Sequence, residues 1–185
     1  MKQKIRTELA GERVLLRRHR AGDAQAIFDA AWESKDALSL WGHWFHAEYS
    51  PAETEQWVNS RAEAWEKGEE YAFAIEDQMT GEFLGGCGIN RIDRLNLFAN
   101  LGYWVRSGRA GQGIATEATR LLASFAFTDL GLLRVEIVAA VENHASRRVA
   151  LKTGARFEAV LRNRLRLRSG PTDAAMFSLI PEDIK

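Results

Sequence analysis

The spacing of apolar residues changes several times along this chain, and each change predicts a new element. Val14, Leu15 and Leu16 lie between charged residues, which predicts a strand over 13–17. Asp23 is suited to cap a helix, because apolar residues then recur at helical spacing. These are Ala24, Ile27, Phe28, Ala31 and Trp32. The aromatic, irregular segment 37–50 predicts a short helix or a loop.

A second helix has clear signals at both ends. Ser50 stands at the N-cap position, Pro51 in the first turn and Glu53 three residues after the serine, the pattern of a capping box. Gly68 predicts the end of this helix after Lys67.

The apolar period then becomes two. It predicts strands over 71–75 and 83–89, antiparallel because only a short turn joins them, and a third strand over 100–105. A helix is expected from about 112 to 130, before Gly131. Its apolar face carries Ala118, Leu121, Leu122 and Phe125.

The last part of the chain alternates strands and a helix. We expect a strand over 133–141, a helix over 144–153 that Gly154 ends, and strands over 157–161 and 174–179. The basic segment 162–168 extends the first of these closing strands. The fourth and fifth predicted strands are then parallel neighbours joined through a helix. The whole pattern predicts one α+β domain over residues 1–185, with a mixed, mostly antiparallel sheet of about seven strands flanked by helices.

Charge and cysteine content bear on which macromolecules this protein binds and in which compartment it works. The 25 basic and 25 acidic side chains give no net charge, so we expect neither nucleic acid nor an anionic membrane surface as partner. Cys87 stands alone and forms no internal disulfide, which fits a reducing cytoplasm. The sequence has neither an apolar run of membrane-spanning length nor the pattern of a signal peptide at its start, so we predict a cytoplasmic protein.

The segment Arg106–Thr116, RSGRAGQGIAT, places glycines where serine or aspartate usually caps a helix. Glycine allows the backbone to approach a ligand, and the first turn of a helix carries unpaired N–H groups that suit phosphate. The residues that would present such groups are Gly111, Gln112, Gly113, Ile114, Ala115 and Thr116. The alternative is a tight turn that binds nothing.

Two common phosphate motifs fit this loop poorly. A P-loop would need Gly-Lys-Ser/Thr, which is missing. A dinucleotide fingerprint nearly fits, with Thr116 at the third glycine and Glu136 about 20 residues later. However, an antiparallel meander precedes the loop, and Glu136 lies in the middle of its strand.

Several ordered motifs together resemble the GNAT N-acetyltransferase superfamily, most closely its RimJ/RimL-type branch. The resemblance covers about residues 8–181. It is carried by the opening strand 13–17 with Asp23, the segments 100–105 and 111–118, the helix 143–150, the ending 153–157 and the strand 175–179. It implies an acetyl-CoA-dependent N-acetyltransferase whose sheet splays between the fourth and fifth strands. No metal is expected.

The resemblance also implies where the cofactor binds. The pantetheine arm would pair with the strand that ends in Trp104 and Val105, as an added strand. The family's diphosphate loop begins with glutamine or arginine, where this chain has Ala110, so Arg106 or Arg109 is expected to supply the missing contact. The expected cofactor-binding residues are thus Trp104, Val105, Arg106, Arg109, Gly111, Gln112, Gly113, Ile114, Ala115, Thr116, Asn143 and Arg148.

For catalysis, the resemblance places Ser146 near the thioester sulfur, where it would protonate the departing thiolate. Glu136 is the best acidic candidate for a base, and His43 and His46 are further candidates. Each also has an ordinary structural interpretation: Asn143 as a helix N-cap, Ser146 as a polar first-turn residue, and Glu136 as a solvated strand residue. Cys87 is expected to be a buried structural residue.

The sequence says least about which amine accepts the acetyl group. Trp41, Trp44 and Phe45 lie where the family builds its acceptor wall, although simple core packing would also explain them. We favour a protein or peptide N-terminal amine, since its pKa of about 7.7–8.0 leaves more neutral amine than lysine has. A small amine, a non-catalytic acyl-CoA sensor, and an RNA- or ribosome-binding module built on Arg162–Arg168 remain alternatives. A homodimer is compatible with the family.

Overall fold

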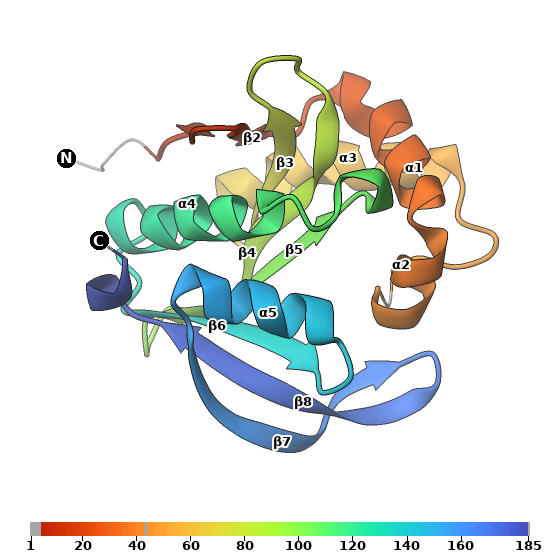
Figure 1. Ribbon diagram of the computed structural model, residues 1–185. Helices are drawn as coiled ribbons and strands as arrows, with labels where there is room; N and C mark the ends of the chain where they lie inside the picture. The colour runs from red at the N-terminus through yellow and green to blue at the C-terminus, as the bar shows by residue number, and fades with distance from the viewer. Residues whose placement is uncertain (1–4, 43, 185) are drawn as a thin grey trace.

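The computed structural model describes residues 5–42 and 44–184. Within these residues, eight strands form one sheet in the order β1-β2-β3-β4-β5-β6-β8-β7 (Figure 1). Their bounds are β1 Glu8–Ala10, β2 Val14–Arg18, β3 Tyr71–Asp77, β4 Phe83–Asp93, β5 Phe98–Val105, β6 Arg134–Ala140, β7 Arg156–Leu167 and β8 Gly170–Leu179. The α-helices are α1 Ala24–Glu33, α2 Lys35–Trp41, α3 Pro51–Lys67, α4 Ile114–Thr128 and α5 His144–Thr153. Short 3-10 turns are η1 Ala21–Asp23, η2 Ser107–Arg109 and η3 Pro181–Asp183.

The predicted α+β class is confirmed, and the strand count is corrected from about seven to eight. The extra strand is β1, which has only three residues and pairs with β2 at the edge of the sheet. A strand this short gives too little alternation for a period of two to be seen. The strands expected as fourth and fifth are therefore β5 and β6.

Local helix signals were reliable, with one exception. Ser50 Oγ accepts a hydrogen bond from the Glu53 N–H at 3.4 Å and donates to Glu53 Oε1 at 3.0 Å. Gly68 and Gly154 end α3 and α5 with positive φ angles of 65° and 98°. Asp23 occupies the N-cap position of α1 as predicted, but its carboxylate makes no cap hydrogen bond there and instead binds the Arg17 guanidinium at 2.7 and 2.8 Å.

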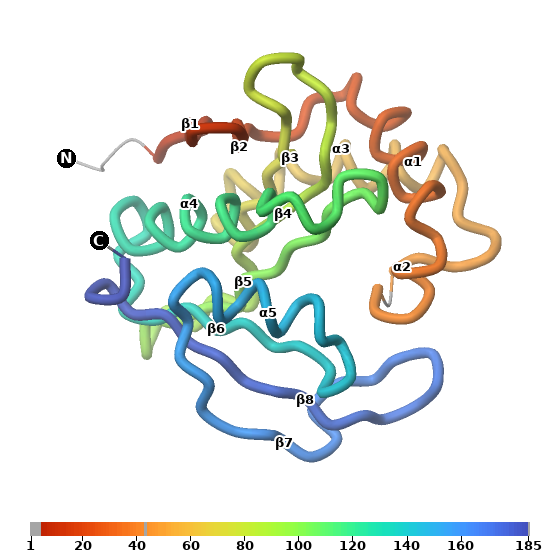
Figure 2. The backbone as a smooth tube through the Cα atoms, viewed as in Figure 1, coloured from red at the N-terminus to blue at the C-terminus, as the bar shows by residue number. Residues whose placement is uncertain are grey.

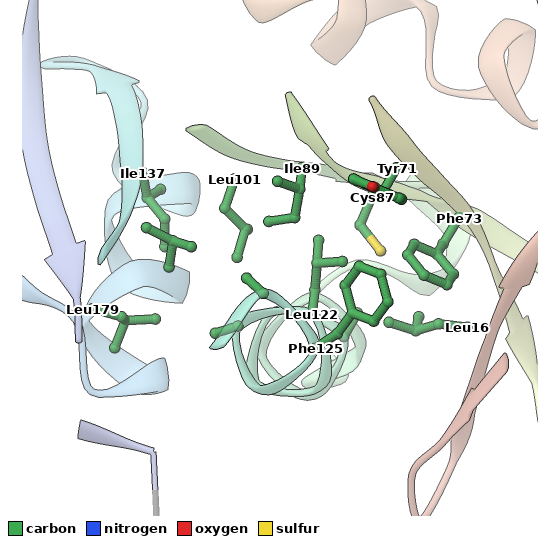
Figure 3. Packing of buried hydrophobic residues seen from close by; sticks show 14 of the residues in the cluster. Leu16, Tyr71, Phe73, Cys87, Ile89, Leu101, Leu122, Phe125, Ile137 and Leu179 are labelled. Atoms are coloured by element: carbon green, nitrogen blue, oxygen red, sulfur yellow. The ribbon is translucent and has the colours of Figure 1, made fainter. Parts of the chain in front are cut away.

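Helix α4 packs across one face of the sheet. Its buried residues Leu122 and Phe125 belong to one core cluster with side chains from both halves of the sheet, among them Phe73 and Ile137 (Figure 3). On the other face, α1 and α3 cover the sheet around Ala74 and Phe83. The core therefore holds the two halves together through helices and not through continuous strand pairing.

The sheet opens between β5 and β6. These parallel strands pair only from Phe98 opposite Arg134 to Asn100 opposite Glu136. Beyond that point β5 pairs with β4 as far as Val105, and β6 pairs with β8. The two halves spread apart in Figure 2, and the expected splay is confirmed.

Candidate active site

The gap between β5 and β6 contains a cavity of about 440 Å³. The end of β5, the loop that leads into α4 and the first turn of α5 line it, together with parts of α2, β6 and β7. Because β5 has no partner strand on this side after Asn100, its backbone polar groups face the gap. An amide-bearing ligand could therefore pair with this strand as an added strand.

The glycine loop is built to present main-chain N–H groups. Gly111 and Gly113 have φ angles of 77° and 83°, a conformation that suits glycine. The first amide of α4 with an acceptor is that of Glu117, which donates to the Gly113 carbonyl at 3.0 Å. Across the described residues, no acceptor pairs with the amides of 111–116. These six N–H groups beside the cavity fit a diphosphate.

The arginines of this loop are held by two glutamates. The Arg106 guanidinium donates to Glu33 at 3.0 Å through Nε, to Glu82 at 3.1 Å and to the Phe83 carbonyl at 3.2 Å. Arg109 also pairs with Glu82, but it lines the cavity, whereas Arg106 does not. The hydrogen bond from Arg106 lowers the pKa of Glu33, with help from the Gly108 N–H at 2.7 Å. Arg106 therefore fastens the loop to α1 in this structure.

Gln112 is likewise turned from the cavity, and its side chain donates to the Gly108 carbonyl at 3.5 Å. Any contribution it makes to the cofactor site would come from its backbone N–H.

The start of α5 brings the expected serine to the cavity. Asn143 caps this helix, since its Oδ1 accepts the Ser146 N–H at 3.0 Å. Arg148 lines the same cavity. The cap uses only the oxygen of the Asn143 amide, so its NH₂ group is left for a ligand. Asn143, Ser146 and Arg148 thus lie together on the β6 side of the gap.

Sequence reasoning missed Tyr103 as a site residue. From β5, its hydroxyl donates to the Ser146 carbonyl at 3.0 Å and lies 3.1 Å from Ser146 Oγ. Burial raises the pKa of Tyr103 to about 12, so its hydroxyl remains protonated at neutral pH. The contact joins residues 43 positions apart, which no local pattern reveals.

A second cavity, of about 770 Å³, lies on the face of the sheet toward α2 and α3. Trp41 lines both cavities and Trp44 lines the second, together with Trp104. Phe45, expected in the same wall, is only 2% exposed and lines neither cavity. It packs against Trp32, Trp44 and Tyr49, so its aromatic ring supports the wall from behind.

The two cavities meet at the splay. The residues that line both come from α2, the end of β5, the middle of β6 and the β7–β8 hairpin: Trp41, Gly102, Tyr103, Trp104, Val138, Leu165 and Leu167. Two compounds bound in the two cavities would therefore approach each other beside Tyr103 and Ser146.

Of the residues expected to act as a general base, those that the structure describes do not line the cavities. Glu136 lines neither cavity, and its carboxylate pairs with Arg134 at 3.0 Å. His46 bonds Glu53 at 2.8 Å and lines neither cavity. His43 lies outside the described residues. The Cys87 thiol sits in the core beneath α4, where burial raises its pKa (Figure 3).

Residues 5–42 and 44–184 contain no cluster of three or more histidine, cysteine, aspartate or glutamate side chains arranged to hold a metal ion. None of the helices in this part of the chain is long and apolar enough to cross a membrane.

Comparison with known proteins agrees with this geometry. Residues 13–156 match the family described as acetyltransferase (GNAT) domain. The chain is 28% identical over 174 residues to YdaF of Bacillus subtilis (strain 168), covering 93% of each protein. It is also 28% identical over 154 residues to the ribosomal-protein-serine acetyltransferase of Escherichia coli (strain K12), covering 83% and 85%. Among solved structures, Mycobacterium smegmatis RimJ in complex with CoA-disulfide superposes with a TM-score of 0.83 at 27% identity, covering 92% and 83%. The chain therefore belongs to the GNAT acetyltransferase family, as an N-acetyltransferase whose donor is acetyl-CoA.

Proposed function

We propose that this protein transfers the acetyl group of acetyl-CoA to the N-terminal amine of a protein or peptide. The observation that carries the proposal is the meeting of the two cavities at the splay, beside Ser146 and Tyr103. One cavity has the amide loop for a diphosphate, and the other has an aromatic wall. The E. coli relative is named a ribosomal-protein-serine acetyltransferase, which supports a protein as the acceptor.

The chain's own groups have separate roles in this scheme. The amides of 111–116 would hold the diphosphate, with Arg109, Asn143 and Arg148 as side-chain contacts, and the backbone of Trp104 and Val105 would align the pantetheine arm. Acetyl-CoA supplies an acetyl thioester whose departing sulfur needs a proton. Ser146 Oγ–H would donate that proton while the Tyr103 O–H turns from the Ser146 carbonyl to donate to Ser146 Oγ. The amine nitrogen would lose a proton as the amide bond forms, and a proton passed through water would restore the Ser146 hydroxyl.

Direct transfer to the amine, with both substrates bound, fits the surroundings better than a covalent enzyme intermediate. The Cys87 thiol is buried in the core, and burial disfavours the thiolate that would have to attack. The Ser146 hydroxyl has Tyr103 as its neighbour and no histidine partner among the described hydrogen bonds. An N-terminal amine needs little help from a base, because a fraction of about a tenth or more is neutral at pH 7.

A screen tests this function. Purified protein is mixed with acetyl-CoA and a panel of peptides with free N-termini, polyamines, aminoglycosides and amino acids, and released thiol is followed. Faster thiol release with the peptides supports the proposal. Turnover only with small amines would assign a different acceptor, and tight acetyl-CoA binding without turnover on any amine would favour a sensor.

The cellular setting is proposed from the same features. A single buried cysteine suits the reducing cytoplasm, and a balanced charge gives no general attraction to nucleic acid. We further propose that residues 1–185 act as one acetyltransferase domain. A homodimer remains a proposal that sedimentation of the purified protein would test.

A further inference from the structure

The floor of the second cavity is a row of very small residues that crosses three strands. The register places Ala72 of β3 opposite Gly88 of β4, and Gly88 opposite Gly102 of β5. All three line the cavity. Side chains alternate between the two faces of a sheet, so this row faces away from the Cys87 and Tyr71 side chains beneath α4.

The rows on either side are covered by helices or carry larger side chains. On one side Ala74, Gly86 and Trp104 are opposite one another, and α1 and α3 pack over them through Ile27 and Val58. On the other side stand the polar residues Asn90 and Asn100, joined by a hydrogen bond of 3.0 Å. The small row is therefore the bottom of a trough, which we call the glycine trough: Ala72, Gly88 and Gly102.

His19 closes the far end of the trough. It follows Arg18, the last paired residue of β2, whose partner Phe73 is next to Ala72. The His19 side chain is only 2% exposed, it lines the cavity, and its ring meets Trp57 edge-on with centroids 4.9 Å apart. A polar side chain this deeply buried at a cavity wall favours a ligand that can hydrogen-bond to it.

The ring nitrogens of His19 face different surroundings. Nδ1 is buried, lies 3.7 Å from Asp23 Oδ2 and has no hydrogen-bond partner in the described part of the chain. That Asp23 oxygen already accepts from Arg17 at 2.8 Å and from the Arg20 N–H at 2.7 Å. Nε2 has no hydrogen-bond partner among the described residues either, and the His19 ring lines the cavity, so this nitrogen can meet a ligand there.

We propose that the glycine trough holds the acceptor polypeptide in an extended conformation and that His19 contacts its distal end. This inference rests on the proposed N-acetyltransferase function and goes beyond it by naming the length that is recognised. From β5 to β2 the sheet spans three strand spacings, about 14 Å, which an extended peptide covers with about four residues. The acceptor is thus a polypeptide start of about four residues, with its amine at the splay and its fourth residue at His19.

The experiment measures kcat/KM for a series of alanine-based peptide amides from one to six residues. The C-termini are amidated because a free C-terminal carboxylate would place a negative charge at a different position in each peptide. With wild-type protein, kcat/KM is expected to rise on the order of tenfold up to four residues and then to stay level. His19→Ala is expected to remove roughly this gain for peptides of four to six residues, and to leave the dipeptide amide and the Kd for CoA unchanged.

A second variant keeps the proposal testable if His19→Ala does not fold. Ala72→Leu fills the trough between Gly88 and His19 while His19 stays in place, and it is expected to cause the same length-dependent loss. Met79→Ala, at a turn residue that is 95% exposed, serves as the control and should match wild type at every length.

Each other result overturns the inference in a recognisable way. Equal kcat/KM for the dipeptide and the hexapeptide would exclude a role of the glycine trough in acceptor binding but would leave the proposed N-acetyl transfer intact. If His19→Ala lowers kcat/KM equally for peptides of all lengths, or does not lower it at all, His19 does not contact the distal end of the acceptor. If no acetyl group is transferred to any peptide or amine, the proposed function is wrong, and this inference is wrong with it.

Discussion

The phenolic oxygen of Tyr103 lies 3.1 Å from Ser146 Oγ and links β5 to α5 across the opening of the sheet. Among the described residues, it is the one hydrogen-bond contact between a β5 side chain and the side chain of the serine expected to act as an acid. Since Tyr103 also donates to the Ser146 carbonyl at 3.0 Å, the two contacts together hold the first turn of α5 against β5.

Ser146→Ala tests the proton donor. We expect kcat to fall about 100-fold, because the departing thiolate loses its acid, while CoA affinity measured by calorimetry stays unchanged. The Asn143 cap is preserved, since it uses the Ser146 backbone N–H. An unchanged kcat would show that water protonates the sulfur instead.

Tyr103→Phe tests whether the tyrosine acts through the serine. Loss of the hydroxyl is expected to lower kcat about tenfold, because Ser146 is no longer oriented. In the Ser146→Ala background the same substitution should have no further effect on kcat. Additive losses in that double-mutant cycle would mean that Tyr103 contributes independently of Ser146.

Ala115→Pro tests the amide loop without disturbing any protein hydrogen bond. Residue 115 is in the first turn of α4, where proline is tolerated, and its N–H has no acceptor among the described residues. Removing one N–H from the diphosphate site should weaken CoA binding by about tenfold or more, as measured by calorimetry. Ala115→Ser keeps the N–H and is the matched control. Equal affinity of the two variants would exclude a role for this amide.

The Arg109–Glu82 pair can be tested from both sides. If Arg109 leaves Glu82 to contact the cofactor, Arg109→Ala should weaken CoA binding roughly threefold. Glu82→Gln should strengthen it by a similar factor, because the arginine is released. Both differences should shrink at high salt. If both substitutions instead weaken binding, the pair serves only to hold the loop.

Acid stability should depend on Asp23. Burial by itself raises the pKa of this carboxyl, but the neighbouring His19, the Arg17 guanidinium and the Arg20 N–H outweigh it and lower the pKa well below the ordinary value of 3.8. The resulting stabilisation is present above pH 3.8 and is lost as the pH falls below it. Asp23→Asn should therefore cost about 3 kcal/mol at neutral pH and less at pH 3, measured by urea unfolding. An equal cost at both pH values would contradict this assignment.

Features of the sequence that act within a few residues were predicted well. The Ser50 cap, the glycine ends of α3 and α5, the glycine loop and the strand periods are local, since each depends on backbone conformation or on neighbours along the chain. The family resemblance added the position of the gap, because the order of these local motifs is specific.

The placement of charged and aromatic side chains followed a different rule. Arg106 was expected at the cofactor but is held by Glu33, and Glu136 was expected at the gap but pairs with Arg134. Phe45 was expected in the acceptor wall but is buried behind it. Glu33 meets Arg106 only through the tertiary structure, whereas Arg134 is two residues from Glu136 on the same strand. In both cases the available ion pair decides where the side chain points.

By itself, then, the sequence determined most of the elements, their order, the glycine loop and the family resemblance. Only the tertiary structure decided that Tyr103 reaches Ser146, that Ala72, Gly88 and Gly102 form one row, and that His19 ends it. The physical reason is that strand register and the splay between β5 and β6 bring together residues far apart in the chain, and such contacts leave no periodic pattern in the sequence.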